Sequence, residues 1–242
     1  MDGQHIASSN SDGTLTVFNR STLESFSIAL ETNGSIQMKL DCLNGRIISC
    51  NDLGFIHLVN SNNTKEVSSF KAHQSECWTV KFIGSNEETF LSGADDGSFK
   101  GWDSRIGYVN SLFANTFHEY GVCCINCNPF NTNQFITGSY DNSFAIWDIR
   151  NLHLPSTATL PLCHEKVGGG AWRAEWHPTN QNIILLSCMY AGNSIFNTES
   201  GDSVQFDSPN NSISYGGIFL NPTQIATCSF YNKKVSLWNI EI

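Results

Sequence analysis

Short apolar strands recur along the chain, each followed by a polar turn and a second strand in which apolar and polar residues alternate. Six segments share this pattern: IASSNSDGTLTVFN (6–19), IISCNDLGFIHLVN (47–60), FLSGADDGSFKGWD (90–103), FITGSYDNSFAIWD (135–148), ILLSCMYAGNSIFN (184–197) and IATCSFYNKKVSLWN (225–239). Two such runs joined by a few turn-forming residues are typical of a β-hairpin. The pattern therefore predicts six hairpins and an all-β fold.

The six hairpins recur at a regular distance. A bulky residue near the end of each second strand marks intervals of 41 to 49 residues, at Phe18, Val59, Trp102, Trp147, Phe196 and Trp238. Two of these positions begin a Trp-Asp pair. A period of about 40–45 residues with a Trp-Asp ending indicates WD repeats, which form the four-stranded blades of a β-propeller. Further apolar strands are expected upstream of the hairpins, at 77–82, 122–127, 171–176 and 215–220. We expect a single WD-repeat β-propeller domain over residues 1–242, with six recognisable repeats.

The third and fourth repeats each carry a His, a hydroxyl, an Asp and a Trp at matching distances. In both repeats the His precedes the Asp by 23 residues and the Trp by 29. The two sets are His73, Ser92, Asp96 and Trp102, and His118, Thr137, Asp141 and Trp147. A hydrogen-bonded tetrad of this kind satisfies buried polar groups in a tight hairpin. A Ser, a His and an Asp also resemble a catalytic triad, but groups tied to one another within a repeat favour the structural interpretation.

Composition and charge narrow the class of protein. The chain is 40% hydrophobic and 12% aromatic, which favours a globular protein over a disordered one. Its net charge of −9 disfavours nucleic acid and favours a basic protein partner. Nine scattered cysteines, mostly inside apolar runs, are expected to be reduced thiols of a cytoplasmic protein. The N-terminus lacks the pattern of a signal peptide, and no apolar run approaches the ~20 residues that span a membrane.

Metal and cofactor motifs are sparse. Cys124 and Cys127 have the spacing of zinc ligands, but no second pair follows, so a strand interior is favoured. The sequence contains no G-x-S-x-G elbow, H-E-x-x-H helix, P-loop or G-x-G-x-x-G loop. We therefore expect neither a metal nor a cofactor. These observations alone predict an interaction module, because most WD-repeat proteins are scaffolds.

Several segments go beyond the general repeat sequence: residues 92–105, ITGSYDNSFAIWDIRN (136–151), GGGAWRAEWHP (168–178), SCMYAGNSIFN (187–197) and ATCSFYNKKVSLWN (226–239). Together they resemble the WD-repeat family of diphthine methyl ester hydrolases, also named diphthine methyltransferases, over roughly residues 70–242. The resemblance implies hydrolysis of the methyl ester of methylated diphthine on translation elongation factor 2, a step in diphthamide biosynthesis. It also implies a seven-bladed ring whose N-terminal blade is missing from this chain.

The implied substrate carries a trimethylammonium group and a methyl ester. The residues that precede the turn acid are expected to face one end of a propeller, and aromatic rings there attract quaternary ammonium groups. The expected substrate-binding residues are Trp78, Tyr140, Trp172 and Tyr231. Asp95 or Glu119 is the candidate base, with Asp95 also a possible counter-charge, and Arg173 the candidate oxyanion stabiliser.

Other interpretations stay open for these residues and for the chain. Trp78 and Trp172 are equally well explained as core aromatics between blades. The three glycines before Trp172 favour close approach of the backbone to a ligand. A pure scaffold and a reader of methyl-lysine peptides are the alternative functions. In each case we expect a monomeric, cytoplasmic protein with a protein substrate or partner, and neither nucleic acid nor membrane.

Overall fold

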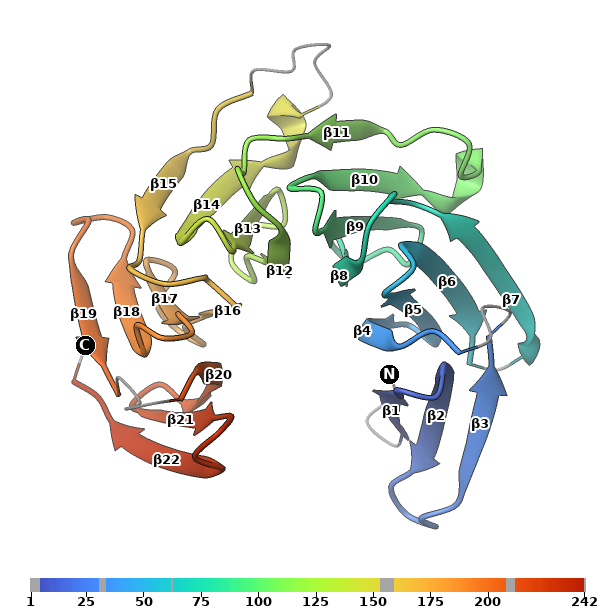
Figure 1. The fold of residues 1–242 in the computed structure, drawn as a ribbon, viewed down its shortest axis with the longest axis horizontal. Coiled ribbons are helices and arrows are strands. Elements are labelled where there is room, and N and C mark those ends of the chain that lie inside the picture. Colours follow the sequence, from blue (N-terminus) through green and yellow to red (C-terminus); the bar gives the residue numbers. More distant parts are fainter. Residues whose placement is uncertain (1–4, 31–33, 62, 153–158, 208–211, 242) are drawn as a thin grey trace. The chain divides into compact units, whose positions relative to one another are not determined.

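The structure is a computed structural model that describes residues 5–30, 34–61, 63–152, 159–207 and 212–241. Within these ranges, 22 strands form six antiparallel sheets, and the helical segments are two 3₁₀ turns, Ser104–Ile106 and Ile149–Asn151. The predicted all-β fold class is confirmed. The chain divides into two compact units, Met1–Thr116 and Phe117–Ile242, each with three sheets (Figure 1). The single domain over residues 1–242 stays a prediction.

The first unit contains the first, second and third sheets. Sequence neighbours pair with one another in every sheet, so each sheet is a meander of hairpins. The strands are β1 (His5–Ser9), β2 (Thr14–Asn19) and β3 (Ser25–Ala29) in the first sheet, β4 (Gln37–Leu43), β5 (Arg46–Asn51), β6 (Phe55–Asn60) and β7 (Asn63–Lys71) in the second, and β8 (Cys77–Phe82), β9 (Thr89–Ala94), β10 (Phe99–Asp103) and β11 (Phe113–Asn115) in the third.

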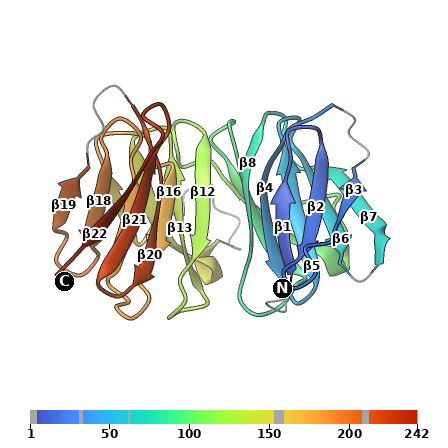
Figure 2. The same ribbon diagram turned by 90° about the horizontal axis from the view of Figure 1, so that it is seen from below.

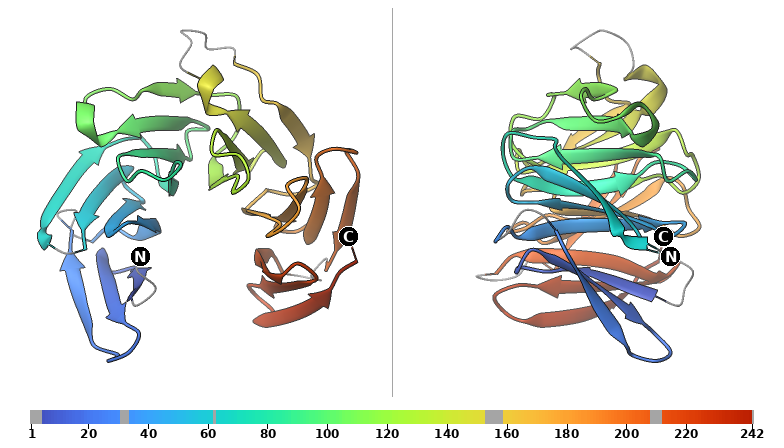
Figure 3. Two further views of the ribbon diagram at one scale, coloured as in Figure 1. Left: turned by 180° about the vertical axis from the view of Figure 1, so that it is seen from behind. Right: turned by 90° about the vertical axis from the view of Figure 1, so that its right-hand side faces the viewer.

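The second unit contains the fourth, fifth and sixth sheets, again as meanders (Figures 2 and 3). The strands are β12 (Val122–Cys127), β13 (Gln134–Ser139), β14 (Ser143–Asp148) and β15 (Cys163–Lys166) in the fourth sheet, β16 (Arg173–Trp176), β17 (Ile183–Ser187), β18 (Asn193–Asn197) and β19 (Ser203–Phe206) in the fifth, and β20 (Ser214–Asn221), β21 (Gln224–Ser229) and β22 (Lys234–Asn239) in the sixth.

All six predicted hairpins are confirmed. They are the pairs β1–β2, β5–β6, β9–β10, β13–β14, β17–β18 and β21–β22. The predicted upstream strands are present as β8, β12, β16 and β20, although β16 begins at Arg173, two residues later than expected. Cys124 and Cys127 both lie in β12, and all nine cysteines are free thiols.

The Asp of each Trp-Asp pair ends its strand and starts a 3₁₀ turn. Asp103 accepts hydrogen bonds from the backbone N–H of Arg105 at 3.0 Å and from its guanidinium at 2.9 and 2.6 Å. Asp148 binds Arg150 in the same way. The carboxylate thus satisfies a backbone donor that the helical turn leaves open.

The hydrophobic core lies between consecutive sheets within each unit. In the first unit, Leu15 and Val17 of the first sheet pack with Ile47 of the second, and Ile56 of the second packs with Phe90 of the third. In the second unit, a larger cluster joins the fourth and fifth sheets, with members Cys124, Ile136, Phe144, Ile146, Ala174, Trp176, Ile184, Leu186 and Phe196. Both faces of an inner sheet are therefore buried, which explains the near-continuous apolar runs in its strands.

Candidate functional site

The four tetrad residues of the third sheet form one hydrogen-bonded chain. Nε1 of Trp102 donates to Ser92 Oγ over 2.8 Å, and Ser92 Oγ lies 2.7 Å from Nε2 of His73. Nδ1 of His73 lies 3.3 Å from an Asp96 carboxylate oxygen. A carboxylate only accepts, so Nδ1 carries the ring proton and Nε2 accepts from the Ser92 hydroxyl. Burial lowers the pKa of His73, which keeps this ring neutral at pH 7.

The fourth sheet repeats this arrangement. Trp147 donates to Thr137 Oγ1 at 2.8 Å, Thr137 Oγ1 lies 2.7 Å from His118 Nε2, and His118 Nδ1 lies 2.9 Å from Asp141. Burial acts to raise the pKa of Asp141, but hydrogen bonds from His118 and Ser143 outweigh it and hold that pKa well below its usual range. Both nitrogens of each tetrad His are therefore engaged within the sheet, which fits a structural role rather than a triad.

The sixth sheet contains a related network that the sequence analysis missed. Trp238 Nε1 donates to Thr227 Oγ1 at 3.0 Å, and Thr227 Oγ1 donates to an Asp207 carboxylate oxygen at 2.8 Å. Asp207 thus takes the place of the His. The sequence does contain one signal for this network. Thr227 has the same position in its hairpin as Thr137, and each of the two hydroxyls accepts a hydrogen bond from the Trp of the next strand.

The second sheet buries a different polar cluster. His57 of β6 is fully buried, with Nδ1 2.8 Å from Ser69 Oγ and Nε2 3.4 Å from Asn51 Nδ2. The Asn51 amide also donates to Ser35 Oγ at 3.1 Å. Burial lowers the pKa of His57 to about 4, so the ring is neutral at physiological pH. This repeat lacks the Trp and the acid, and these side chains stabilise its turn instead.

Five aromatic rings of the second unit contact one another in succession, and we call this series the aromatic ladder. Tyr140 contacts Trp172 with 5.5 Å between ring centroids, and Trp172 contacts Tyr215 at 5.2 Å. Tyr215 contacts Phe230 at 5.3 Å, and Phe230 contacts Tyr231 at 5.1 Å. The aromatic ladder therefore joins Tyr140, Trp172 and Tyr231, as the sequence predicts, through Tyr215 and Phe230, which it missed.

Exposure along the aromatic ladder changes from one end to the other. Trp172 is 5% exposed, whereas Tyr215, Phe230 and Tyr231 are 36%, 54% and 62% exposed. The Arg173 guanidinium lies 5.2 Å from the Trp172 ring centroid and donates to the Trp172 carbonyl oxygen at 2.7 Å. A fixed cation thus already lies over the buried indole, so the exposed rings at the other end are better placed for a second cation.

The three glycines that precede Ala171 and Trp172 approach other atoms of the protein, not open space. A Cβ atom on Gly169 would lie 2.2 Å from the Cys188 carbonyl oxygen, and one on Gly170 would lie 2.7 Å from Met189 Sδ. Gly168 has a φ of +76°, which favours glycine. The close approach expected for a ligand is therefore made by the turn that joins β17 and β18, and this corrects the interpretation of the glycines as a ligand contact.

Two further predicted residues meet in the first unit. The indole Nε1 of Trp78, in β8, donates to an Asp95 carboxylate oxygen at 3.2 Å, and Asp95 is exposed in the turn after β9. Trp78 is only partly buried, so it differs from the buried core aromatics. The pair offers an accessible carboxylate beside an aromatic ring.

Glu119 lies in the second unit, close to the start of the aromatic ladder. Its side chain is exposed, and its backbone N–H donates to Asp141 at 3.2 Å. The two residues after Glu119 are bound to the end of β13 and the turn that follows it. Ser139 Oγ donates to the Tyr120 carbonyl oxygen, and the Tyr140 N–H donates to the Gly121 carbonyl oxygen. The Glu119 carboxylate is thus carried by a segment fixed alongside Tyr140.

Comparisons with known proteins identify relatives of this chain. The repeat model "WD domain, G-beta repeat" matches residues 64–103 and 110–148. The chain is 37% identical to the diphthine methyltransferase of Homo sapiens over 158 residues, and 32% identical to the diphthine methyltransferase homolog of Dictyostelium discoideum over 197 residues. It is similar to the WD-repeat diphthine methyltransferases. The alignments cover 64% and 72% of this chain, but only 33% and 52% of those two diphthine methyltransferases.

The fold agrees with this assignment. A chain of the solved structure titled "Crystal Structure of Mitotic Checkpoint Complex" superposes with a TM-score of 0.83 at 16% sequence identity, covering 99% of this chain and 72% of that one. At that identity the likeness shows the fold alone, and with the repeat match it confirms the WD-repeat propeller class for this diphthine methyltransferase relative. Among the residues that the structure describes, no helix is long and apolar enough to cross a membrane.

Proposed function

We propose that this chain acts in diphthamide biosynthesis and hydrolyses the methyl ester of methylated diphthine on translation elongation factor 2. The family relationship supports the pathway, because the relatives are named diphthine methyltransferases. The observation that carries the reaction is the aromatic ladder, which has exposed rings at one end and the Arg173 guanidinium over its buried member Trp172. A substrate with a cationic group and an ester needs both kinds of contact.

The trimethylammonium group binds at the exposed end of the aromatic ladder. Phe230 and Tyr231 meet edge to face at 88° and are more than half exposed, so two ring systems are open to one bulky cation. Each good cation–π contact is worth about 0.5–2 kcal/mol. Trp172 supports this end indirectly by packing against Tyr215, because its own ring is buried beneath Arg173.

The ester lies toward Arg173 and Glu119. The Glu119 carboxylate takes a proton from water as the water oxygen attacks the ester carbonyl carbon, and Arg173 stabilises the resulting oxyanion. When the C–O bond to the methoxy group breaks, the proton passes to that oxygen and methanol leaves. The product is the carboxylic acid, which releases its remaining acidic proton to solvent and is left as the free carboxylate. Arg173 is suited to this role because a bond to the Trp172 carbonyl and stacking on its indole hold the guanidinium in place.

Asp95 remains the second candidate for a carboxylate role. It is exposed and accepts a hydrogen bond from Trp78, so in the first unit it can bind an organic cation as a counter-charge beside an aromatic face. Glu119 is the stronger candidate for the base because it is fixed beside Tyr140, which is itself part of the aromatic ladder.

Steady-state hydrolysis of methylated elongation factor 2 tests these assignments. Tyr231→Ala should raise KM by roughly 2- to 30-fold, in line with the loss of one cation–π contact, and leave kcat nearly unchanged. Glu119→Gln should lower kcat by about 10²–10⁴-fold, as expected for loss of a general base. Tyr190→Ala is the matched control, because this tyrosine is 69% exposed in the turn of the fifth sheet but lies outside the aromatic ladder.

The other candidate functions give different results in the same assay. A methyl-lysine reader would bind trimethyl-lysine peptides through Phe230 and Tyr231 and release no methanol. A scaffold would bind the elongation factor without any effect of the ladder substitutions. Full activity in Glu119→Gln together with loss of activity in Asp95→Asn would reassign the base.

A further inference from the structure

Met189, in the turn between β17 and β18, has a left-handed backbone with a φ of +48°. Residues with a long side chain seldom adopt this conformation, because their Cβ atom crowds the following carbonyl oxygen. The residues at the corresponding turn positions of the third, fourth and sixth sheets, Asp95, Tyr140 and Tyr231, do not have a positive φ. A strained residue persists where its surroundings hold it, and such strain is concentrated at functional sites.

Three contacts hold Met189 in this conformation. Its carbonyl oxygen accepts a hydrogen bond from the Ser214 N–H at 2.8 Å and another from the Gly192 N–H at 3.2 Å. The first of these belongs to a β-bridge between the turn of the fifth sheet and the first residue of β20 in the sixth. The thioether packs over Gly170, where a Cβ atom would lie 2.7 Å from Met189 Sδ. The left-handed turn therefore directs the Met189 carbonyl to the sixth sheet.

Residues 212–214, here called the connector segment, also hold the exposed rings of the aromatic ladder. The Ile213 carbonyl oxygen accepts a hydrogen bond from the Phe230 N–H at 3.0 Å. Ser212 Oγ accepts one from the Tyr231 N–H, also at 3.0 Å. All three residues of the connector segment are buried, so their hydrogen bonds are shielded from water. The connector segment thus fixes the backbone of both rings, and its last residue is bound to Met189.

We propose that Met189 is a positioning residue for the aromatic ladder. Its left-handed turn holds the connector segment, and with it Phe230 and Tyr231, in place to bind a quaternary ammonium group. The same turn anchors the buried member of the ladder, because the Trp172 N–H donates to the Ser187 carbonyl oxygen at 2.9 Å, two residues before Met189. This inference rests on the cation site of the proposed function, and it assigns Met189 no contact with the substrate.

Leucine and isoleucine at position 189 test the proposal as a matched pair. The two side chains are isomers, but isoleucine is β-branched and is excluded from the left-handed conformation. The probe is tetramethylammonium chloride, titrated by nuclear magnetic resonance. Met189→Ile should raise Kd by at least about 5-fold, comparable to the loss of one cation–π contact. Met189→Leu conserves volume and should stay within about 2-fold of wild type.

Ser214→Pro tests the same link from the opposite side. Proline lacks the N–H that donates to Met189, and it is tolerated at the first position of a strand. This variant should weaken binding of the probe as Met189→Ile does. With methylated elongation factor 2 as substrate, both variants should raise KM by a similar factor and leave kcat within about 2-fold, because they remove binding and not chemistry.

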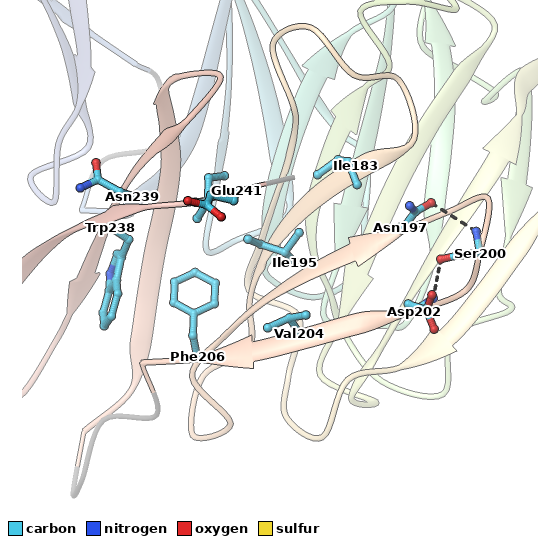
Figure 4. A pocket seen from close by; sticks show the side chains of 11 residues that line it. Ile183, Ile195, Asn197, Ser200, Asp202, Val204, Phe206, Trp238, Asn239 and Glu241 are labelled. Carbon is cyan, nitrogen blue, oxygen red and sulfur yellow. Dashed lines mark hydrogen bonds between the residues drawn. The ribbon is translucent and has the colours of Figure 1, made fainter.

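A pocket lined by the fifth and sixth sheets is the alternative site for the probe. It has a volume of about 360 Å³, an apolar wall that includes Phe206 and Trp238, and the carboxylates of Asp202 and Glu241 (Figure 4). No member of the aromatic ladder lines this pocket. Tyr231→Ala should therefore weaken binding of the probe at the ladder, whereas it would leave binding in the pocket unchanged.

Equal Kd values for folded Met189→Leu and Met189→Ile overturn the proposal, and so does wild-type affinity in Ser214→Pro. Circular dichroism verifies that each variant is folded. A wild type that does not bind the probe, or binding that Tyr231→Ala leaves unchanged, overturns the positioning role together with the cation site. Binding with the expected difference between leucine and isoleucine, but without hydrolysis, supports the positioning role and contradicts only the proposed reaction.

Discussion

Single side chains contribute most where hydrogen bonds converge on one buried atom. Thr137 Oγ1 accepts from Trp147 and lies within hydrogen-bond distance of His118, and all three residues are at most 4% exposed. Removal of one member leaves buried polar groups without a partner, and that cost exceeds the net value of the bond itself. The tetrads are therefore the positions where a substitution should change stability without changing chemistry.

His118→Ala should lower the free energy of unfolding by roughly 1–3 kcal/mol, because Asp141 and Thr137 each lose a hydrogen bond in a buried network. Chemical denaturation measures this change. His164→Ala, at an exposed position in β15, should change stability by less than about 0.5 kcal/mol. Wild-type stability combined with lost hydrolysis in His118→Ala would show that the His is catalytic and that the structural interpretation is wrong.

At the scale of strands and sheets, a glycine lets the fourth sheet pack closely against the backbone that leads into the fifth. A Cβ atom on Gly138 of β13 would lie 2.3 Å from the Ala171 carbonyl oxygen and 2.7 Å from Cys124 Sγ. Ala171 immediately precedes the ladder residue Trp172. The distance between the fourth and fifth sheets therefore fixes the position of Trp172 and Arg173 relative to Tyr140.

Gly138→Ala should destabilise the protein by about 1–3 kcal/mol, since the methyl group has to displace backbone. Gly216→Ala is the matched control in β20, where a Cβ atom would meet only Cys228 Sγ at 3.4 Å. Thermal unfolding compares the two variants. Equal melting temperatures for both would contradict the proposed close contact between the sheets.

The second sheet should make stability depend on pH. The pKa of His57 is lowered to about 4, against about 6.5 in an unfolded chain, so between these values the unfolded state binds more protons. The contribution of His57 to the free energy of unfolding is fully present above pH 6.5 and is lost as the pH falls toward 4. Melting temperatures measured from pH 7.5 to pH 5 should decrease, and the decrease should be smaller in His57→Gln. An identical pH dependence in the variant would exclude His57 as its source.

Much of the fold could be predicted from sequence, for local reasons. Hairpins are encoded by alternation and by short turns, which is why all six were found. The strand β7 contains seven polar or charged residues among nine, so its pattern does not indicate a strand. Tyr215 and Phe230 were missed because contacts across neighbouring sheets, not repeat position, bring them to the aromatic ladder. The burial of Trp172 beneath Arg173 likewise depends on packing between sheets.

For the chain taken together, the similarity to diphthine methyltransferases supports a role in diphthamide biosynthesis, and methyl ester hydrolysis on a protein side chain is our proposal. The relatives are longer, and this chain spans about half or less of the diphthine methyltransferases of Homo sapiens and Mus musculus and of the homolog of Dictyostelium discoideum. We therefore predict that the two units of the 242-residue chain are sufficient for activity.

The most direct measurement is mass spectrometry of methylated elongation factor 2 after incubation with the purified 242-residue chain. Multiple turnovers should convert the modified histidine from the methyl ester to the free carboxylate, with an equal amount of methanol released. Tyr231→Ala should slow this conversion at low substrate concentration, and Tyr190→Ala should not. An unchanged substrate mass, with the folded chain bound to the elongation factor, would contradict hydrolysis and leave a binding module.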